Sequence, residues 1–407
     1  MSLPGLSRAT AGVRLPGTAA SSAIRRPAEA LYKLRSSTTA IAMAVYAATR
    51  IISVCTFWLL LPLRGFRPIR RSGGIWIYLT RSSDAGWYSR IAEHGYQHSA
   101  PGTFHFYPGY PAAIDTIAWI PGIGIARAGI VITAIAGLVA AAGLAQLGLR
   151  LTGDSRISVL LVALWAVAPS ALVLSMVYPE ALACALAVWA LVAVADRRWI
   201  TAGVLTMLAG TVHSSAVTLM AAVAVAAIAA VIESARSGWR PLGAWLRPIA
   251  AVMISPLGLI GFWLFVSEGL RYPGGWPAAE SASGQRIDWG VGTWHAVVST
   301  VGAPNAFKLL SVLAILAAVA LAAWTVTERI PAYLKVYVVC TVLLALLTGP
   351  GWLGSKPRIL LPALLLGFPL AKILAPSRNH VLIPMIAILA AASAWFTLIQ
   401  TTVGIAP

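Results

Sequence analysis

Charged residues are scarce in this chain, and acidic residues are the scarcest. Lys, Arg, Asp and Glu make up 10% of the 407 residues, and only 12 residues are acidic. Soluble proteins carry about 25% charged residues, so this deficit excludes an ordinary soluble domain. The hydrophobic fraction of 59% and the mean hydropathy of +0.82 agree with that exclusion. The composition predicts an all-α, polytopic integral membrane protein.

Cysteine is also rare. The three cysteines, Cys55, Cys184 and Cys340, each lie inside an apolar run. An odd number of isolated thiols provides neither a disulfide framework nor the close spacing of a cysteine metal site. We expect them to pack as small apolar residues.

Positive charge is in excess, with a formal net charge of +18. The basic residues are scattered through short loops and the N-terminal segment, which argues against a nucleic-acid partner. Residues 1–38 are rich in Ser, Ala, Pro and Arg and lack a helical apolar period, so we predict a disordered basic tail on the cytoplasmic side. Residues 39–407 are predicted to form a single transmembrane domain.

Apolar runs long enough to cross a hydrocarbon core of ~30 Å predict about eleven spans, within a range of 10–12. They cover 39–63, 127–149, 157–175, 180–195, 200–212, 214–232, 247–267, 306–326, 332–348, 358–375 and 381–402. The run 200–232 is divided at His213, because only this division places the basic connectors of all later loops in the cytoplasm.

This topology places most aromatic and acidic loop segments outside a plasma membrane. The outer segments are the loop 64–126, the turn 175–180, His213, the loop 268–305 and the turn 349–358. Four arginines in the first outer loop depart from the positive-inside rule, namely Arg64, Arg67, Arg70 and Arg71.

The stretch DAGWYSRIAEH, from Asp84 to His94, predicts a short amphipathic helix at the membrane surface. Ser83 or Asp84 is suited to cap its N-terminus, and Gly95 to end it. The Asp84 carboxylate can therefore be a helix cap, a group that faces a substrate, or both. The next segment, FHFYPGYP, contains Tyr107 and is suited to an interfacial anchor or to a groove for a lipid or sugar ring.

Basic residues occur at two sites where a charge needs a partner: within the first span and at the outer end of a late span. Arg50 lies in the middle of the first span, where an unpaired charge costs at least ~2.5 kcal/mol, so we expect an acidic partner or a wet cavity. Lys356 and Arg358 lie at the outer mouth of a late span, where they can bind a phosphate or extend to the interface. Arg358 is favoured for phosphate because its planar fork binds two oxygens.

Four segments resemble, in order, the PIG-V family of membrane mannosyltransferases. They are DAGWYSRIAEHGY from Asp84, FYPGYP from Phe106, PSALVLSMVYPEAL from Pro169 and SKPRILLPALLLGFP from Ser355. The resemblance implies a GT-C-like fold and a polyprenyl-phosphate sugar as donor, with mannose transferred to a lipid-linked or glycan acceptor. Ser83 stands where the family usually has Trp, and His213 where Arg or Asn is commoner. Both departures concern the identity of the sugar and the acceptor.

The resemblance also implies roles for individual residues. Asp84 matches the acid that serves as general base, and inversion at the anomeric carbon needs no second carboxylate nucleophile. Glu180 is suited either to complement a helix macrodipole or to orient sugar hydroxyls. The other implied substrate contacts are Glu93, His94, Tyr107, Tyr178, His213, Lys356 and Arg358. Trp276, Trp289 and Trp294 are suited to stack on a sugar or to form an interfacial belt.

No cofactor is expected, and a divalent metal is left open as an alternative. The chain lacks a DxD-type acid pair and a Gly-rich phosphate loop, which argues against a nucleotide-sugar donor with bound metal. A zinc enzyme is the first alternative, since His94 and His98 are four residues apart with Glu93 and His105 nearby, but Gly95 would end the helix between the two histidines. The second is a transporter of a lipid-linked sugar, against which the absence of an internal repeat argues. Arabinose or glucose transfer would use the same chemistry.

Overall fold

The computed structural model describes residues 19–61, 74–96, 103–236, 242–282, 287–302, 305–348 and 353–402, without the side chains of 19–32 and 401–402. Within these ranges every regular element is helical, apart from an isolated bridge between Ile287 and Thr348. The α-helices are α1 (Ala19–Leu60), α3 (Gly74–Arg81), α4 (Asp84–His94), α5 (Gly109–Ala118), α6 (Ile125–Thr152), α7 (Ser155–Ala166), α8 (Glu180–Ala195), α9 (Trp199–Val212), α10 (Ala216–Arg236), α11 (Gly243–Ile254), α12 (Leu257–Leu264), α13 (Gly275–Ala282), α14 (Val291–Gly302), α15 (Ala306–Thr327), α16 (Ala332–Leu347), α17 (Lys356–Ile359), α18 (Phe368–Leu374) and α19 (Asn379–Thr402). Three short helices of other types are η3 (Ala171–Ser175), η4 (Phe265–Gly269) and η5 (Leu353–Ser355).

Six of the described helices are long and apolar enough to cross a membrane. They are Lys33–Leu60, Ile125–Thr152, Ala216–Arg236, Gly243–Gly269, Ala306–Thr327 and Asn379–Gln400. Four more are apolar but shorter, at Ser155–Ala166, Glu180–Ala195, Trp199–Val212 and Ala332–Leu347. The predicted all-helical fold is confirmed within the described residues, and the six long apolar helices are consistent with a membrane protein. The four shorter helices bring the apolar helices to ten, one fewer than the eleven predicted spans.

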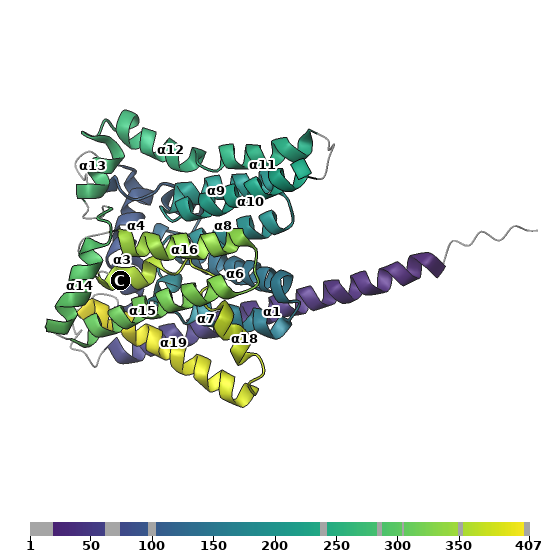
Figure 1. The fold of residues 1–407 in the computed structure, drawn as a ribbon. Helices are drawn as coiled ribbons and strands as arrows, with labels where there is room; N and C mark the ends of the chain where they lie inside the picture. The colour runs from purple at the N-terminus through teal and green to yellow at the C-terminus, as the bar shows by residue number, and fades with distance from the viewer. Residues whose placement is uncertain are drawn as a thin grey trace, which may run out of the picture.

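The long helices lie side by side, and four of the short ones gather at one end of the bundle. α6 packs against α8, α8 against α9, and α10 against α16. Figure 1 shows α3, α4, α13 and α14 together at the left of the bundle, while the first turns of α1 project beyond it at the right. We call the left end, formed by these four helices and by η5–α17, the α4 end.

The predicted division of the run 200–232 is confirmed. α9 ends at Val212, and α10 begins at Ala216. His213 has an extended backbone that interrupts the helix, and its Nδ1 accepts a hydrogen bond from the backbone N–H of Ser215 at 3.1 Å. The ring therefore replaces part of the backbone hydrogen bonding that the break removes.

Two predicted spans are broken in the structure. Residues 358–375 form α17, a series of turns and then α18, instead of one helix. Pro362 and Pro369 explain the break, because proline lacks the N–H that a helix interior requires. Residues 157–175 likewise end as α7 at Ala166 and continue as η3 after Pro169. The FHFYPGYP segment also ends in a helix that we did not predict, α5, which begins at Gly109.

The N-terminal segment differs from the predicted disordered tail. Residues 19–38 belong to α1, while residues 1–18 lie outside the described residues. The segment 19–38 contains five Ala and three Arg, which have high helix propensity. Because it continues directly into the first span, each added residue extends an existing helix without the cost of a new nucleus.

Arg50 binds backbone carbonyls, which corrects the expectation of an acidic partner or a wet cavity. Its two terminal nitrogens donate to the carbonyl oxygens of Ala166 and Ala171, and its guanidinium lies 5.6 Å from the centre of the Tyr46 ring. These carbonyls belong to the last turn of α7 and the first residue of η3. A charged side chain thus supplies the donors that the broken backbone lacks in an apolar interior.

Replacing Arg50 with Leu should destabilise the fold. Two buried carbonyls would lose their donors, at about 1–3 kcal/mol each. Thermal unfolding of the purified protein in detergent measures the effect. Arg197→Leu is the control, because that side chain is 59% exposed and its pair with Glu233 contributes at most about 1 kcal/mol. Equal stability of the two variants would contradict the assigned role of Arg50.

Candidate functional site

Three charged side chains from distant parts of the sequence meet at the α4 end. The Nη1 atom of Arg358 lies 2.7 Å from Oδ2 of Asp84, and its Nε atom lies 3.2 Å from Oε1 of Glu180. The same guanidinium lies 5.2 Å from the centre of the Tyr178 ring. One cation is therefore shared by two carboxylates and rests on an aromatic face. We call Asp84, Glu180 and Arg358 the shared-arginine cluster.

The turn between α3 and α4 positions Asp84. Ser83 adopts a φ of 52°, a left-handed backbone conformation that costs a residue with a side chain about 1–3 kcal/mol. Asp84 is then the first residue of α4, and no side chain caps this helix end. The predicted helix Asp84–His94 is confirmed with the same bounds, but the Asp84 carboxylate binds Arg358 instead of capping the helix.

Glu180 and Tyr178 are held against this turn by a backbone bond. The N–H of Val177 donates to the carbonyl of Leu79 at 2.9 Å, which joins the segment before α8 to the last turns of α3. Pro179 then begins α8, so that Glu180 lies in its first turn, where a carboxylate also complements the helix macrodipole. Glu180 is 2% exposed.

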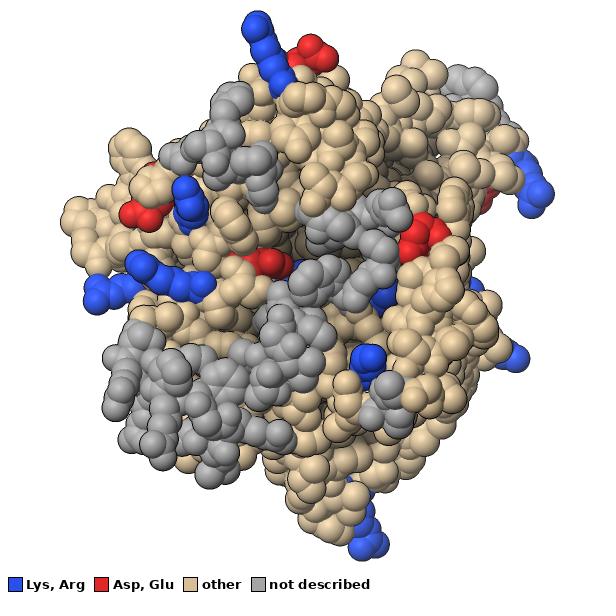
Figure 2. Space-filling model, turned by 90° about the vertical axis from the view of Figure 1, so that its left-hand side faces the viewer, with Lys and Arg blue, Asp and Glu red and all other residues tan. Residues whose placement is uncertain are grey.

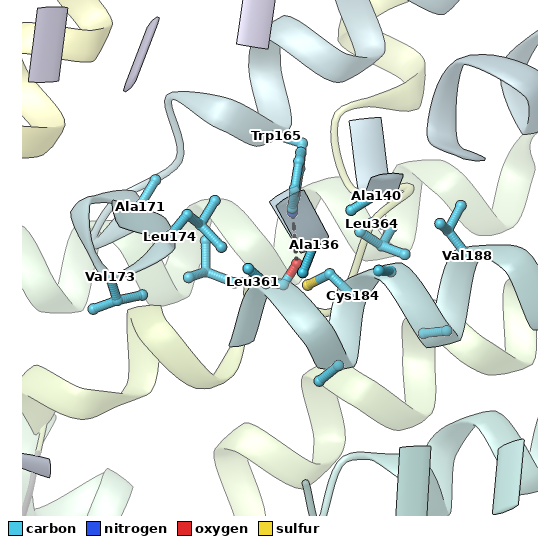
Figure 3. Packing of buried hydrophobic residues seen from close by; sticks show 14 of the residues in the cluster. Ala136, Ala140, Trp165, Ala171, Val173, Leu174, Cys184, Val188, Leu361 and Leu364 are labelled. Atoms are coloured by element: carbon cyan, nitrogen blue, oxygen red, sulfur yellow. Dashed lines mark hydrogen bonds between the residues drawn. The ribbon is translucent and has the colours of Figure 1, made fainter. Parts of the chain in front are cut away.

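Arg358 is fixed because its whole segment is anchored through backbone carbonyls. Trp165 Nε1 donates to the carbonyl of Leu361 at 3.1 Å, a contact that Figure 3 shows among the packed side chains around Cys184. The hydroxyl of Tyr337 donates to the carbonyl of Pro362 at 2.6 Å, and Gln400 donates to that of Gly354. Three separate helices thereby hold a stretch that is too short to be stable as a helix by itself.

Lys356 also anchors the segment that carries Arg358, because its ammonium binds backbone carbonyls. It is therefore less suited to the predicted phosphate contact. Its ammonium donates to the carbonyls of Ala345 and Thr348 at 2.9 and 2.7 Å, at the C-terminus of α16. Burial lowers the pKa of Lys356 to about 8, although the Asp288 carboxylate opposes this. Of the two predicted phosphate ligands, Arg358 is the one brought to Asp84.

The three members of the cluster differ in access to solvent. The side chain of Asp84 is 24% exposed, that of Arg358 11% and that of Glu180 3%. Figure 2 looks onto the α4 end, where acidic and basic side chains lie around a recess and uncharged residues cover most of the remaining face. Asp84 is therefore the carboxylate of the cluster that is most accessible to solvent.

Two histidines lie within electrostatic range of the cluster. Burial and, to a smaller extent, the positive charge of Arg358 together lower the pKa of His213 to about 4. Burial also lowers the pKa of His105 to about 4, although Asp84 opposes this shift. The Nδ1 atom of His105 is buried and has no hydrogen-bond partner within the described ranges. His105 was not among the predicted substrate contacts, because nothing in a proline-flanked aromatic segment indicates which ring is buried near a charged residue.

The other predicted contacts lie elsewhere. Glu93 and His94 face solvent at the far end of α4, with 58% and 50% of their side chains exposed and 3.8 Å between them. Tyr107 packs with Phe262 and Trp276 in a separate aromatic cluster. Trp276 stacks on Trp263 at 4.8 Å, whereas Trp289 and Trp294 are largely exposed.

Among the described residues, the cysteines and the possible metal ligands form neither a disulfide nor a metal site. Cys184 is buried in the core as predicted, Cys340 is half-buried and Cys55 is exposed, and all three are free thiols. Among the residues that the structure describes, no three His, Cys, Asp or Glu side chains lie close enough to hold a metal ion. His98, one of the histidines of the zinc alternative, lies outside the described residues.

Neither the family models nor the curated proteins with which the chain was compared include a match.

Acid should destabilise the protein through these neutral histidines. Between pH 6.5 and about 4 the unfolded chain binds a proton at His105 that the folded chain does not, so stability is lost as pH falls through this window. His105→Gln should reduce the fall of the thermal midpoint between pH 7 and 4.5, while His213 still contributes. A His380→Gln variant, changed at an exposed position, should keep the wild-type pH dependence. Parallel curves for wild type and His105→Gln would contradict a neutral, buried His105.

Proposed function

We propose that this chain is an inverting membrane glycosyltransferase that transfers mannose from a polyprenyl-phosphate donor to a lipid-linked or glycan acceptor. The observation that carries the proposal is the contact of Arg358 with both Asp84 and Glu180. Three of the four segments on which the family resemblance rests contribute these residues. A resemblance in sequence order alone would not require the segments to meet in space.

The chemistry needs a base and a cation close together. The acceptor hydroxyl oxygen forms a bond to the anomeric carbon as the bond from that carbon to the phosphate oxygen breaks. The phosphate leaves with the electron pair, and the hydroxyl proton passes to the base. Asp84 is the proposed base because its carboxylate is the most accessible of the cluster.

Arg358 is the proposed partner of the donor phosphate. The phosphodiester of the donor carries one negative charge shared by two non-bridging oxygens, and these two oxygens can compete with a carboxylate for a guanidinium. Its binding would take Arg358 from Asp84 and free the Asp84 carboxylate to accept a proton. Glu180 would then keep the guanidinium in place from the buried side, where it is 3.2 Å away. Base and cation are thus activated by the same binding event.

The distribution of charge supports a cytoplasmic N-terminus and a site on the outer face of the plasma membrane. The ion pairs of Arg150 with Asp196 and of Lys372 with Glu328 lie in the connectors remote from α4, although Arg81, Arg90 and Arg127 lie at the α4 end. In the proposed topology the shorter apolar helices also span, within a GT-C-like arrangement of about eleven helices. Membrane lipids would surround them.

Asp84→Asn should abolish sugar transfer while leaving the protein folded. Removing a general base costs about 100-fold or more in rate. We would measure transfer from radiolabelled polyprenyl-phosphate-mannose to endogenous lipid acceptors in membranes with matched expression and EDTA present. Asp115→Asn is the matched control, because this carboxylate is exposed on α5.

Three outcomes separate the possibilities. Loss of transfer in Asp84→Asn alone supports the base. Transfer at the wild-type rate in Asp84→Asn would leave Asp84 as a structural partner of Arg358. Absence of transfer by the wild type from every polyprenyl-phosphate sugar would contradict the proposed function and favour transport of a lipid-linked sugar.

A further inference from the structure

A cavity of about 730 Å³ lies on the side of α4 that faces away from Asp84. Asp84, Tyr88 and Ile91 share one face of α4 and point toward the core. The opposite face lines the cavity together with α3 and the start of α6. The lining residues are Trp76, Arg81, Gly86, Ser89, Arg90, Glu93, Gly124, Ile125, Ala126 and Arg127. None of this surface belongs to the shared-arginine cluster.

The cavity carries an excess of positive charge. Arg81, Arg90 and Arg127 line it against a single acid, Glu93. Arg127 donates to the carbonyl of Gly122 at 3.1 Å, and Arg90 lies 5.9 Å from the centre of the Trp87 ring. None of the three arginines forms a salt bridge with another described residue. Their fork-shaped groups are suited to bind an anion with several oxygens.

The backbone adds donors to the same space. α6 begins at Ile125 with Gly124 as its N-cap, and no side chain caps this end of a 28-residue helix. The first N–H groups of a helix have no partner within the helix, and the macrodipole favours an anion beside them. Four consecutive residues at this helix start line the cavity.

Exposed apolar side chains near the cavity indicate where the anion comes from. Trp76 is 43% exposed at its wall, and Trp119 and Ile120, just before Gly122, are 80% and 48% exposed. Tryptophans at the surface of a membrane protein mark the level of the lipid headgroups. The cavity therefore opens where a headgroup, and not only a soluble ion, can reach it.

We propose that this cavity binds the phosphate of an anionic lipid headgroup. The phosphate oxygens are met by Arg81, Arg90 and Arg127 and by the free N–H groups at the start of α6. The acyl chains lie against Trp76 and Trp119. The proposal does not depend on sugar transfer, because it concerns binding at a surface that the proposed reaction does not use.

Gly124 allows a test in which stability and binding move in opposite directions. A Cβ at this position meets no atom within 4 Å, and the φ of −80° suits any residue. Asp and Asn are both good N-caps, so both variants should keep or raise the thermal midpoint. Gly124→Asp places a negative charge in the cavity and should weaken binding at least about fivefold, whereas Gly124→Asn should bind within about twofold of wild type.

The binding assay uses the full chain in phosphatidylcholine nanodiscs that contain a fluorescent phosphatidylglycerol, read by energy transfer from the protein. Arg90→Gln and Arg127→Gln should each weaken binding about fivefold, and the triple variant with Arg81→Gln about 100-fold. Arg271→Gln is the matched control, since this exposed arginine does not line the cavity. Binding of fluorescent phosphatidylcholine should be the same in all variants.

Two results would overturn the proposal. One is a Gly124→Asp variant that binds the anionic lipid as tightly as Gly124→Asn. The other is displacement of the labelled lipid by 10 mM inorganic phosphate, which would identify a site for free phosphate instead of a headgroup. Loss of sugar transfer in Asp84→Asn with unchanged lipid binding would show that the two sites fail separately.

Discussion

The arrangement of the α4 end depends on one guanidinium that two carboxylates share. Asp84 and Glu180 would repel each other without Arg358, and Arg358 would be a buried, unpaired charge without them. Removing one partner of a buried ion pair costs about 3–5 kcal/mol. This cost applies to Arg358 and Glu180, whose side chains are 11% and 3% exposed, and less to Asp84, whose side chain is 24% exposed. The start of α4, the start of α8 and the α17 segment are therefore tied together by charge, although they lie far apart in the chain.

The need to satisfy backbone carbonyls in an apolar interior explains why polar and charged side chains surround the segment that carries Arg358. The segment that carries Arg358 is not a spanning helix, so its carbonyls need donors from elsewhere. Trp165, Tyr337 and Gln400 supply them, and Arg50 does the same for the end of α7. These polar and charged side chains stabilise irregular backbone, and this backbone in turn places a charged cluster beside the core.

Several features could be predicted from the sequence because they depend on local order. The helix Asp84–His94 and the break at His213 follow from N-terminal and glycine signals and from charge in the connectors. The broken span at 358–375 was mistaken because the hydropathy of its leucines outweighed Pro362 and Pro369. Arg50 was given the wrong kind of partner because sequence cannot show which carbonyls a distant helix end leaves free.

The sequence by itself determined that this protein is helical and that several of its helices are apolar enough to cross a membrane, since 59% of its residues are hydrophobic and many of them lie in long runs. It also identified Asp84, Glu180 and Arg358 as residues of interest. Only the tertiary structure decided that these three meet, that Lys356 instead holds the end of α16, and that His105 is buried with no hydrogen-bond partner at Nδ1 among the described residues. The physical reason is that charge pairing and backbone satisfaction are set by distances between elements, and such distances are not encoded in any single stretch of sequence.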